Sequence, residues 1–403
     1  MNVTVLPHRS GSEIYELNEE QLLFAFNEND SDTDDQGMIP FDRVSYSVYN
    51  IKKRTMESIL PDLSKFKAAD IRYAGYGSHL YFVHLEYPSF PLATFILFEY
   101  DTKTSVCREI YRFEDNLKLY ENEKDIKLFA LNDQYIIFQI RQEKLRSKSG
   151  KFAAYLYDTK NKIIYDIVDE RFINQGISQF IRVANNVCAI RFGHNQLVLD
   201  KLVPMKESEC VNESICLVSI SQLIADILLR ISIVSSELID EVFISQTFSD
   251  IAKMGKYITY SRINRVDGHQ EIYFYQYVKK QMSMVINNNV YSPKNIFPCV
   301  ISGEPLLVRR YDRSYEFYRI ENENVVCRIP ANERIVFLGG DHMVINKKKK
   351  RLFSEGKEYS FEILQFPEMK RVYHEMSRAV KVIPSGKEEL LIFVDEKRLK
   401  DNG

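Results

Sequence analysis

The nine residues Ala153–Ala154–Tyr155–Leu156–Tyr157–Asp158–Thr159–Lys160–Asn161 contain the pattern on which the fold prediction rests. Aromatic and aliphatic residues fill the first five positions, as in a packed strand. Asp, Thr, Lys and Asn follow at once, and such residues solvate a tight turn. The stretch therefore predicts a β-strand that ends at Tyr157 and is followed by a hairpin turn.

The same pattern, a strand ending in an aromatic residue and then a polar turn, recurs along the chain. Its copies cover residues 44–53, 95–104, 153–161, 272–280 and 315–324, with a degenerate copy at 361–364. Tyr49, Tyr100 and Tyr157 end the first three copies at intervals of 51 and 57 residues, and the next copy ends at Tyr277. Because the interval from Tyr157 to Tyr277 is about two periods long, a further copy is expected near Val218.

A second set of short apolar strands lies between these hairpins. Its members are residues 22–26, 80–83, 135–140, 187–190, 257–260, 306–308 and 343–345. Each follows a shorter first strand, such as Ile71–Tyr73 or Ile181–Val183. The repeating unit therefore has four strands over roughly 40–60 residues and occurs seven times, with an eighth half-unit at 380–383 and 390–394.

A sheet that is apolar on both faces needs other elements to cover both faces from water. Each fully buried Phe contributes about 1.5–3 kcal/mol, and that gain is lost if a face stays in water. Radial stacking covers every face and leaves only short edges. The repeat resembles the β-propeller superfamily over nearly the whole chain. Since Trp is absent there is no WD dipeptide, and no Gly-Gly kelch pattern occurs, so periodicity alone carries the resemblance. The predicted fold class is all-β, a propeller of seven or eight four-stranded antiparallel blades, with a short helical insertion near 221–232.

We predict a single propeller domain over residues 1–403. The expected blades are 12–62, 70–113, 126–168, 179–232, 240–287, 296–329 and 334–376, followed by a closing hairpin at 379–395. The isolated strand Val3–Leu6 is expected to complete that last hairpin, as is common in propellers; the alternative is a frayed tail.

Composition limits the classes of function. The formal charge is −2 and 45% of the residues are hydrophobic, which disfavours both a dedicated nucleic-acid binder and a disordered chain. The first residues lack a signal-peptide core, and no apolar run is long enough to span a bilayer. Six widely spaced cysteines indicate reduced, buried thiols. The sequence predicts a cytoplasmic monomer without a membrane span.

The loops after the second strands are long and are expected to share one face of the blades. They cover residues 27–42, 143–150, 191–213, 264–268 and 346–357. Long loops on a rigid scaffold commonly carry binding sites. This loop-bearing face, with the channel mouth, is therefore the predicted partner surface.

Cationic or polar residues recur where the second strands end: Asn27, His84, Arg141, Arg191, Arg262, Arg309, Arg310 and Lys347. In register, they would form a basic rim that attracts an acidic peptide or an anionic ligand. The alternative, which the sequence favours, is that each cation pairs with a neighbouring carboxylate.

Catalytic and metal-binding motifs are scarce. No G-x-S-x-G, H-E-x-x-H, paired C-x-x-C, P-loop or G-x-G-x-x-G pattern occurs, and no cofactor is expected. His84, His194 and His269 are weak candidates for metal ligands that converge from successive blades, with ordinary surface or core histidines as the alternative. The acidic stretch 28–35 lacks the Gly and Glu that a calcium loop requires.

The sequence is compatible with two functions. The first is a non-catalytic scaffold that binds another protein or peptide. The second is a propeller enzyme, a hydrolase or lyase that acts on a glycan or small anionic substrate in the central channel. Leu223, Ile224, Ile227, Leu228 and Ile231 have helical spacing, which predicts core packing or, if exposed, a docking helix.

Overall fold

The structure is a computed structural model of the 403-residue chain. It describes residues 2–8, 12–18, 21–28, 43–58, 72–76, 79–89, 92–101, 103–104, 106–118, 126–142, 151–193, 213–242, 246–264, 269–286, 296–311, 314–319, 324–330, 333–350, 357–385 and 389–395. The chain forms two compact units, Gly11–Glu241 and a second unit that joins Met1–Ser10 to Val242–Gly403.

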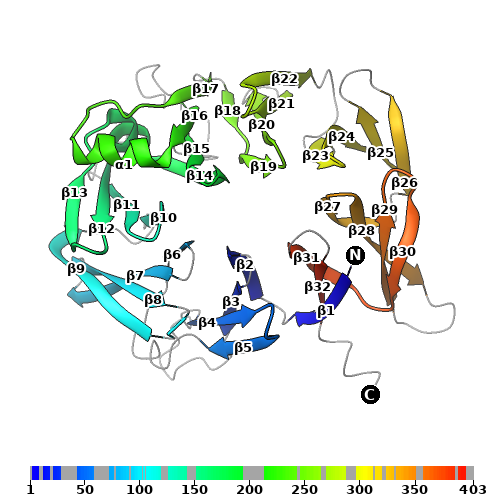
Figure 1. The fold of residues 1–403 in the computed structure, drawn as a ribbon, viewed down its shortest axis with the longest axis horizontal. Helices are drawn as coiled ribbons and strands as arrows, with labels where there is room; N and C mark the ends of the chain where they lie inside the picture. Colours follow the sequence, from blue (N-terminus) through cyan, green and yellow to red (C-terminus); the bar gives the residue numbers. More distant parts are fainter. Residues whose placement is uncertain are drawn as a thin grey trace. The chain divides into compact units, whose positions relative to one another are not determined.

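The unit Gly11–Glu241 contains four antiparallel sheets of four strands (Figure 1). The first sheet has β2 (Ser12–Asn18), β3 (Gln21–Glu28), β4 (Arg43–Asn50) and β5 (Thr55–Ser58). The second has β6 (Arg72–Tyr76), β7 (His79–Ser89), β8 (Leu92–Asp101) and β9 (Val106–Lys118). The third has β10 (Ile126–Ala130), β11 (Tyr135–Gln142), β12 (Lys151–Asp158) and β13 (Ile163–Asp166). The fourth has β14 (Ile177–Ala184), β15 (Val187–Phe192), β16 (Glu213–Ser219) and β17 (Glu237–Val242).

The second unit contains the remaining four sheets. The fifth sheet has β18 (Gln246–Phe248), β20 (Tyr257–Asn264), β21 (Gln270–Gln276) and β22 (Gln281–Ile286), and the short β19 (Ala252–Met254) also pairs with β20. The sixth has β23 (Ile296–Ile301), β24 (Glu304–Arg310), β25 (Ser314–Arg319) and β26 (Val325–Pro330). The seventh has β27 (Arg334–Gly339), β28 (His342–Lys350), β29 (Lys357–Gln365) and β30 (Lys370–Glu375). The eighth has β1 (Asn2–His8), β32 (Glu389–Asp395) and β31 (Ala379–Ser385).

These eight sheets are the blades of a β-propeller, which confirms the predicted fold class and its upper blade count. In the fourth blade the structure adds β17 as the outermost strand, so that blade ends at Val242 rather than at residue 232. In the eighth blade β1 pairs with β32 in parallel, with Val3 opposite Leu390 and Leu6 opposite Phe393. The N-terminal strand thus belongs to the last sheet.

Helix α1 (Ile220–Leu228) confirms the predicted helical insertion and ends four residues earlier than the predicted range. Ser219 begins it as the N-cap, and its hydroxyl accepts a hydrogen bond from the Gln222 amide. Leu223, Ile224 and Ile227 are buried in one core cluster with residues of the third and fourth blades. Leu228 packs against the same cluster, so four residues of the predicted stripe lie in or against the core, whereas Ile231 lies beyond the end of the helix and is 41% exposed.

Neighbouring blades share apolar clusters within each unit. In the second unit, one cluster joins the sixth and seventh blades and another joins the seventh and eighth. Buried amides add a specific contact between adjacent sheets. Asn346 in β28 donates to the Ala379 carbonyl oxygen at 2.7 Å and accepts from the Ala379 amide at 3.0 Å. Gln139 in β11 contacts both backbone groups of Ile177 in β14 in the same way.

The described residues contain no helix with the length and hydrophobicity that a bilayer-spanning segment needs.

Candidate functional site

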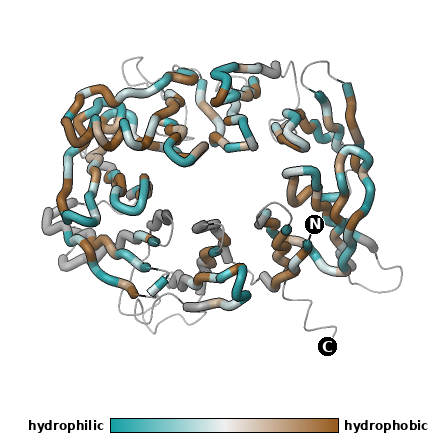
Figure 2. Tube along the Cα trace, in the orientation of Figure 1, coloured by the Kyte–Doolittle hydropathy of each residue, from teal (hydrophilic) through white to brown (hydrophobic). Residues whose placement is uncertain are grey.

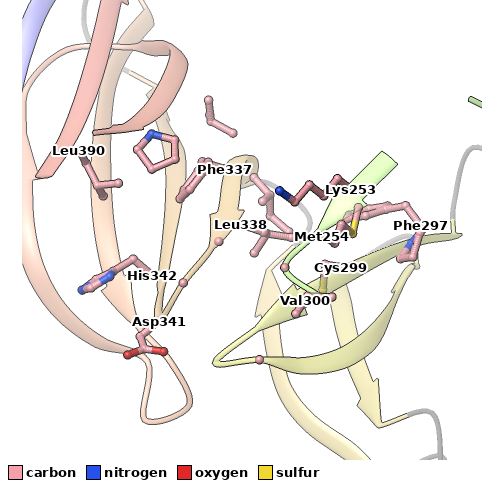
Figure 3. Close-up of a pocket in the computed structure, with 18 of the residues that line it drawn as sticks. Lys253, Met254, Phe297, Cys299, Val300, Phe337, Leu338, Asp341, His342 and Leu390 are labelled. Carbon is pink, nitrogen blue, oxygen red and sulfur yellow. The ribbon is translucent and has the colours of Figure 1, made fainter. Parts of the chain in front are cut away.

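A cavity of about 980 Å³ lies within the second unit, where residues of its four blades meet (Figure 3). Its walls come from β19, β23 and β27 and from the adjoining ends of β31 and β32. The lining side chains are mainly apolar, and they include Met254, Phe297, Val300, Ile335, Val336, Phe337, Leu338 and Leu390. This composition suits an apolar ligand group.

Strand β27 supplies the longest part of the lining. Its residues Ile335 to Leu338 are four consecutive apolar residues, and all are only half-buried. A register shift between Ile335 and Phe337 marks a β-bulge, which changes the alternation of side chains along the strand. As a result, Ile335 and Leu338 pack toward the sixth blade, whereas Val336 and Phe337 pack toward the eighth.

Hairpin turns between first and second strands form one end of the cavity. Gly303 (φ +75°) and Gly340 (φ +56°) have left-handed backbones, and an added Cβ at either position would meet no atom within 4 Å. The Ser302 amide donates to the Gly340 carbonyl oxygen at 2.7 Å, which joins the turns of two neighbouring blades. The cavity therefore lies near the turn end of these blades, opposite the ends that continue into the long loops.

A few polar groups lie among the apolar ones. Asp341, His342 and Leu390 lie on one side of the cavity, and Lys253 with Met254 lies on the other (Figure 3). Glu389 accepts a hydrogen bond from the Thr4 hydroxyl at 2.9 Å. Opposite charges on facing walls would orient a bound segment that is itself polar at its ends.

The cavity also contains a thiol that is not prepared for nucleophilic chemistry. Cys299 is 3% exposed, and burial, together with the nearby Cys327, raises the pKa of its thiol well above the ordinary value. A protonated thiol is a poor nucleophile, so we assign Cys299 to the wall of the cavity.

Among the predicted rim residues, Arg191 is deeply buried. It lies near the end of β15 and forms an ion pair of 2.9 Å with Glu213 of β16, and both side chains are almost fully inaccessible. For this residue the structure has the carboxylate pairing that the sequence analysis gave as the alternative to a rim.

The predicted rim residues of the second unit also have intramolecular partners. Lys347 contacts Glu333 at 3.2 Å and Glu362 at 2.8 Å. Arg262, Arg309 and Arg310 lie over the rings of Tyr273, Tyr318 and Tyr315 at 5.1, 4.8 and 5.7 Å. These are cation–π distances, so each of the three guanidinium groups contacts an aromatic face.

Most of the other predicted site residues have side chains that lie outside the described part of the structure. His84 lies in β7 and Arg141 in β11, but their side chains are outside the described part of the structure, as are His194 and the acidic stretch 29–35. His269 is half-buried, and its carbonyl oxygen accepts from the Asn264 amide. Among the described residues no group of three or more His, Cys, Asp or Glu side chains is arranged to hold a metal ion.

The cavity is not predictable from the repeat pattern, because its residues come from four separate repeats. The one sequence signal is the run Ile335–Leu338, which is apolar without alternation at the start of a blade. Such a run is typical of a strand with apolar neighbours on both faces.

No protein-family model matches the chain, and no curated protein matches it. Solved structures with a similar fold include the β-propeller domain of the Trilobed protease from Pyrococcus furiosus, at 12% identity and a TM-score of 0.44, with 92% of this chain and 100% of that chain covered. An oligogalacturonate lyase in complex with manganese has 11% identity and a TM-score of 0.40, with coverage of 77% and 74%. The acylaminoacyl peptidase of Pyrococcus horikoshii has 12% identity and a TM-score of 0.44, and the chain spans 65% of its length. The similarity concerns the fold alone.

Proposed function

We propose that the protein is a non-catalytic binding scaffold that takes an apolar peptide segment of another protein into the cavity of its second unit. The observation that carries this proposal is the apolar lining supplied by four successive blades. A cytoplasmic location and a monomeric state belong to the same proposal, and both come from the sequence.

The size of the cavity supports a peptide as the ligand. About 980 Å³ lies at the upper end of the range of roughly 300–1,000 Å³ for small-molecule sites, which is enough for several side chains. Among the described strands, β23 and β27 each pair with a neighbouring strand on one side only. An extended segment beside them has backbone groups available for hydrogen bonds.

The cavity is a different site from the loop-bearing face that the sequence predicts as the partner surface. The long loops fall mostly outside the described residues, and the rim cations that the structure describes contact carboxylates or aromatic rings. A rim that binds an acidic peptide or an anion would have to compete with these contacts. The turn end of the second unit therefore offers the better supported site.

A peptide selection tests the proposal. Random 12-residue peptides displayed on phage are selected on the full-length protein, and the dissociation constant of the best peptide is measured by calorimetry. We expect apolar sequences whose affinity falls at least tenfold in Met254→Arg, because that substitution places a charge in the cavity. Met376→Arg is the matched control, since Met376 is 54% exposed and outside the cavity lining.

Two outcomes would contradict the proposal. One is a set of selected peptides that bind Met254→Arg as tightly as the unmodified protein. The other is that no peptide binds, while a panel of acidic mono- and oligosaccharides raises the thermal midpoint of the unmodified protein but not of Met254→Arg. The second result would favour the alternative function, an enzyme for a glycan or small anionic substrate.

A further inference from the structure

Four large apolar side chains are exposed in the segment after α1 and at the start of the outer strand β17, in the unit Gly11–Glu241. Leu229, Ile231, Ile233 and Leu238 are 71%, 41%, 72% and 57% accessible. Single exposed apolar residues are common, but four within ten residues are a concentration of apolar side chains of the kind found at interaction sites. We refer to these four residues as the 229–238 surface. The hydropathy colouring is largely brown along α1 and the segment after it (Figure 2).

Buried carboxylates hold the backbone of this segment in place. Asp226, 4% exposed, accepts from the Ser235 amide at 2.7 Å and from the Gln222 side chain at 2.7 Å. Asp169, 1% exposed, accepts from the Val234 amide at 2.7 Å. Charge-assisted hydrogen bonds of this length are among the strong ones. The turn is therefore fixed at two points by groups within the core.

Arg171 adds a third attachment. Its guanidinium donates to the Val234 carbonyl oxygen at 2.8 Å and to the Ser236 hydroxyl at 2.7 Å, while it pairs with Asp169 at 2.6 Å. Val234 is itself buried, so Ile233 and Ser235 on either side of it turn outward. The exposed apolar side chains thus stand on a rigid base, and rigidity before binding lowers the entropic cost of binding.

The charged side chains beside this surface are mainly acidic. Asp166 is 4.0 Å from Arg230, and both are well exposed. Glu170 is exposed and adjoins Asp169, and Glu237 directly precedes Leu238. Beside the ion pairs Asp166–Arg230 and Asp169–Arg171, Glu170 and Glu237 add two carboxylates, and a basic partner complements this balance.

We propose that the 229–238 surface docks a basic amphipathic segment of a partner protein, with the partner's apolar face on Leu229, Ile231, Ile233 and Leu238. This surface is separate from the cavity of the second unit. An anionic lipid surface is disfavoured because the neighbouring carboxylates would repel it. A second copy of this chain would bring the same acidic residues together.

A defined peptide pair tests the proposal. The probe is a fluorescein-labelled 18-residue peptide of Leu and Lys at helical spacing, compared with the same peptide carrying Glu in place of Lys. Fluorescence anisotropy on the full-length protein should show binding of the Lys peptide at least tenfold tighter than the Glu peptide, and weaker at 0.5 M salt because charges are screened.

Two double variants locate the binding. Leu229→Ser/Ile233→Ser should lower the affinity for the Lys peptide at least tenfold. It should not lower the thermal midpoint of the protein, because both side chains are exposed. Val106→Ser/Val278→Ser is the matched control, since Val106 and Val278 are 53% and 73% exposed elsewhere, and it should change the affinity less than twofold. Hydrogen exchange at residues 229–238 should slow when the Lys peptide is added.

The proposal is overturned by equal binding of the two peptides, or by equal loss of affinity in the control variant. It is also overturned if sedimentation shows a dimer that Leu229→Ser/Ile233→Ser dissociates, because the occupant would then be a second copy. None of these results bears on the cavity, since Met254 plays no part in them.

Discussion

Buried amides at matching positions of two second strands tie each strand to the first strand of the next blade. Asn346 is 6% exposed, and its side chain forms hydrogen bonds with both the amide and the carbonyl group of Ala379. Gln139, fully buried, does the same for Ile177. A backbone group that is buried without a partner costs about 1–3 kcal/mol, so these side chains should matter more than their size suggests.

We therefore expect Asn346→Leu to lower the free energy of unfolding by about 2–4 kcal/mol, since it leaves two backbone groups of Ala379 without partners. Asn185→Leu, at an exposed turn, is the control and should change it by less than about 0.5 kcal/mol. Urea unfolding followed by circular dichroism measures both. Equal midpoints for the two variants would show that water replaces the amide.

The buried Arg191–Glu213 pair gives a second prediction. Removing one partner of such a pair leaves an uncompensated charge, which costs about 3–5 kcal/mol, whereas replacing both by apolar residues can be nearly neutral. Arg191→Met and Glu213→Leu should each be strongly destabilising, and the double variant should lose less than the sum. Urea unfolding of the four proteins in this cycle measures the coupling, and strictly additive losses would contradict it.

Stability at acid pH should depend on Glu362. Burial alone raises the pKa of this carboxyl, but hydrogen bonds and charges from Lys347 and Arg371 outweigh burial and hold the pKa below its ordinary value. A carboxyl whose pKa is lower in the folded state stabilises the fold above its unfolded pKa, about 4.3, and loses that contribution as the pH falls further.

Lys347→Met should therefore lower the thermal midpoint at pH 7, and the difference from the unmodified protein should shrink below about pH 4. Lys348→Met is the control, because Lys348 is exposed and adjacent in the same strand. A difference that stays constant from pH 7 to pH 3 would mean that packing of the Lys347 stem, not the charge, is what the variant removes.

At the scale of elements, the regular parts of the fold were predictable and the exceptions were not. The copies ending at Tyr49, Tyr100 and Tyr157 each lie where the third strand of a blade ends, because aromatic residues fill sheet faces wherever the repeat recurs. Strand β19 joins the fifth blade although no repeat in the sequence predicts it. Its three residues form a strand because they pair with β20.

The candidate site shows the same limit. The sequence placed cations at strand ends, but it could not tell whether their neighbours would be carboxylates or aromatic rings, because those neighbours lie on adjacent strands. Helical spacing predicts a core helix or a docking helix at 223–231, whereas the four exposed apolar residues of the 229–238 surface all follow the last residue of α1. Helical spacing does not report what the chain does beyond the last turn.

The attachment of the segment after α1 can be tested directly. Asp226→Ala removes the acceptor of the Ser235 amide, so that amide and its neighbours should exchange with solvent at least tenfold faster. Native-state hydrogen exchange with mass spectrometry measures this. Ser221→Ala, at an exposed position of the same helix, is the control. Unchanged protection at Ser235 would show that Asp169 and Arg171 hold the turn alone.

At the scale of the whole molecule, removal of β1 should destabilise strands that lie at the opposite end of the sequence, because β1 pairs with β32. Val3 and Val5 pack on the core shared by the seventh and eighth blades, and Thr4 bonds Glu389. A chain that begins at residue 9 should therefore unfold at a lower temperature. A synthetic peptide of residues 1–10 should bind it and restore the midpoint, whereas a scrambled peptide should not. Equal midpoints for the long and short chains would contradict this.

The pairing of β1 with β32 also has a consequence for biosynthesis. Residues 2–8 leave the ribosome long before their partners, residues 389–395. Residues 11–241 can assemble their four sheets in the interval, since their strands pair among themselves. Strand β1, in contrast, has an open hydrogen-bonding edge until β32 has been synthesised. A nascent chain that stalls early would therefore carry an unsatisfied strand, the kind of surface that chaperones bind.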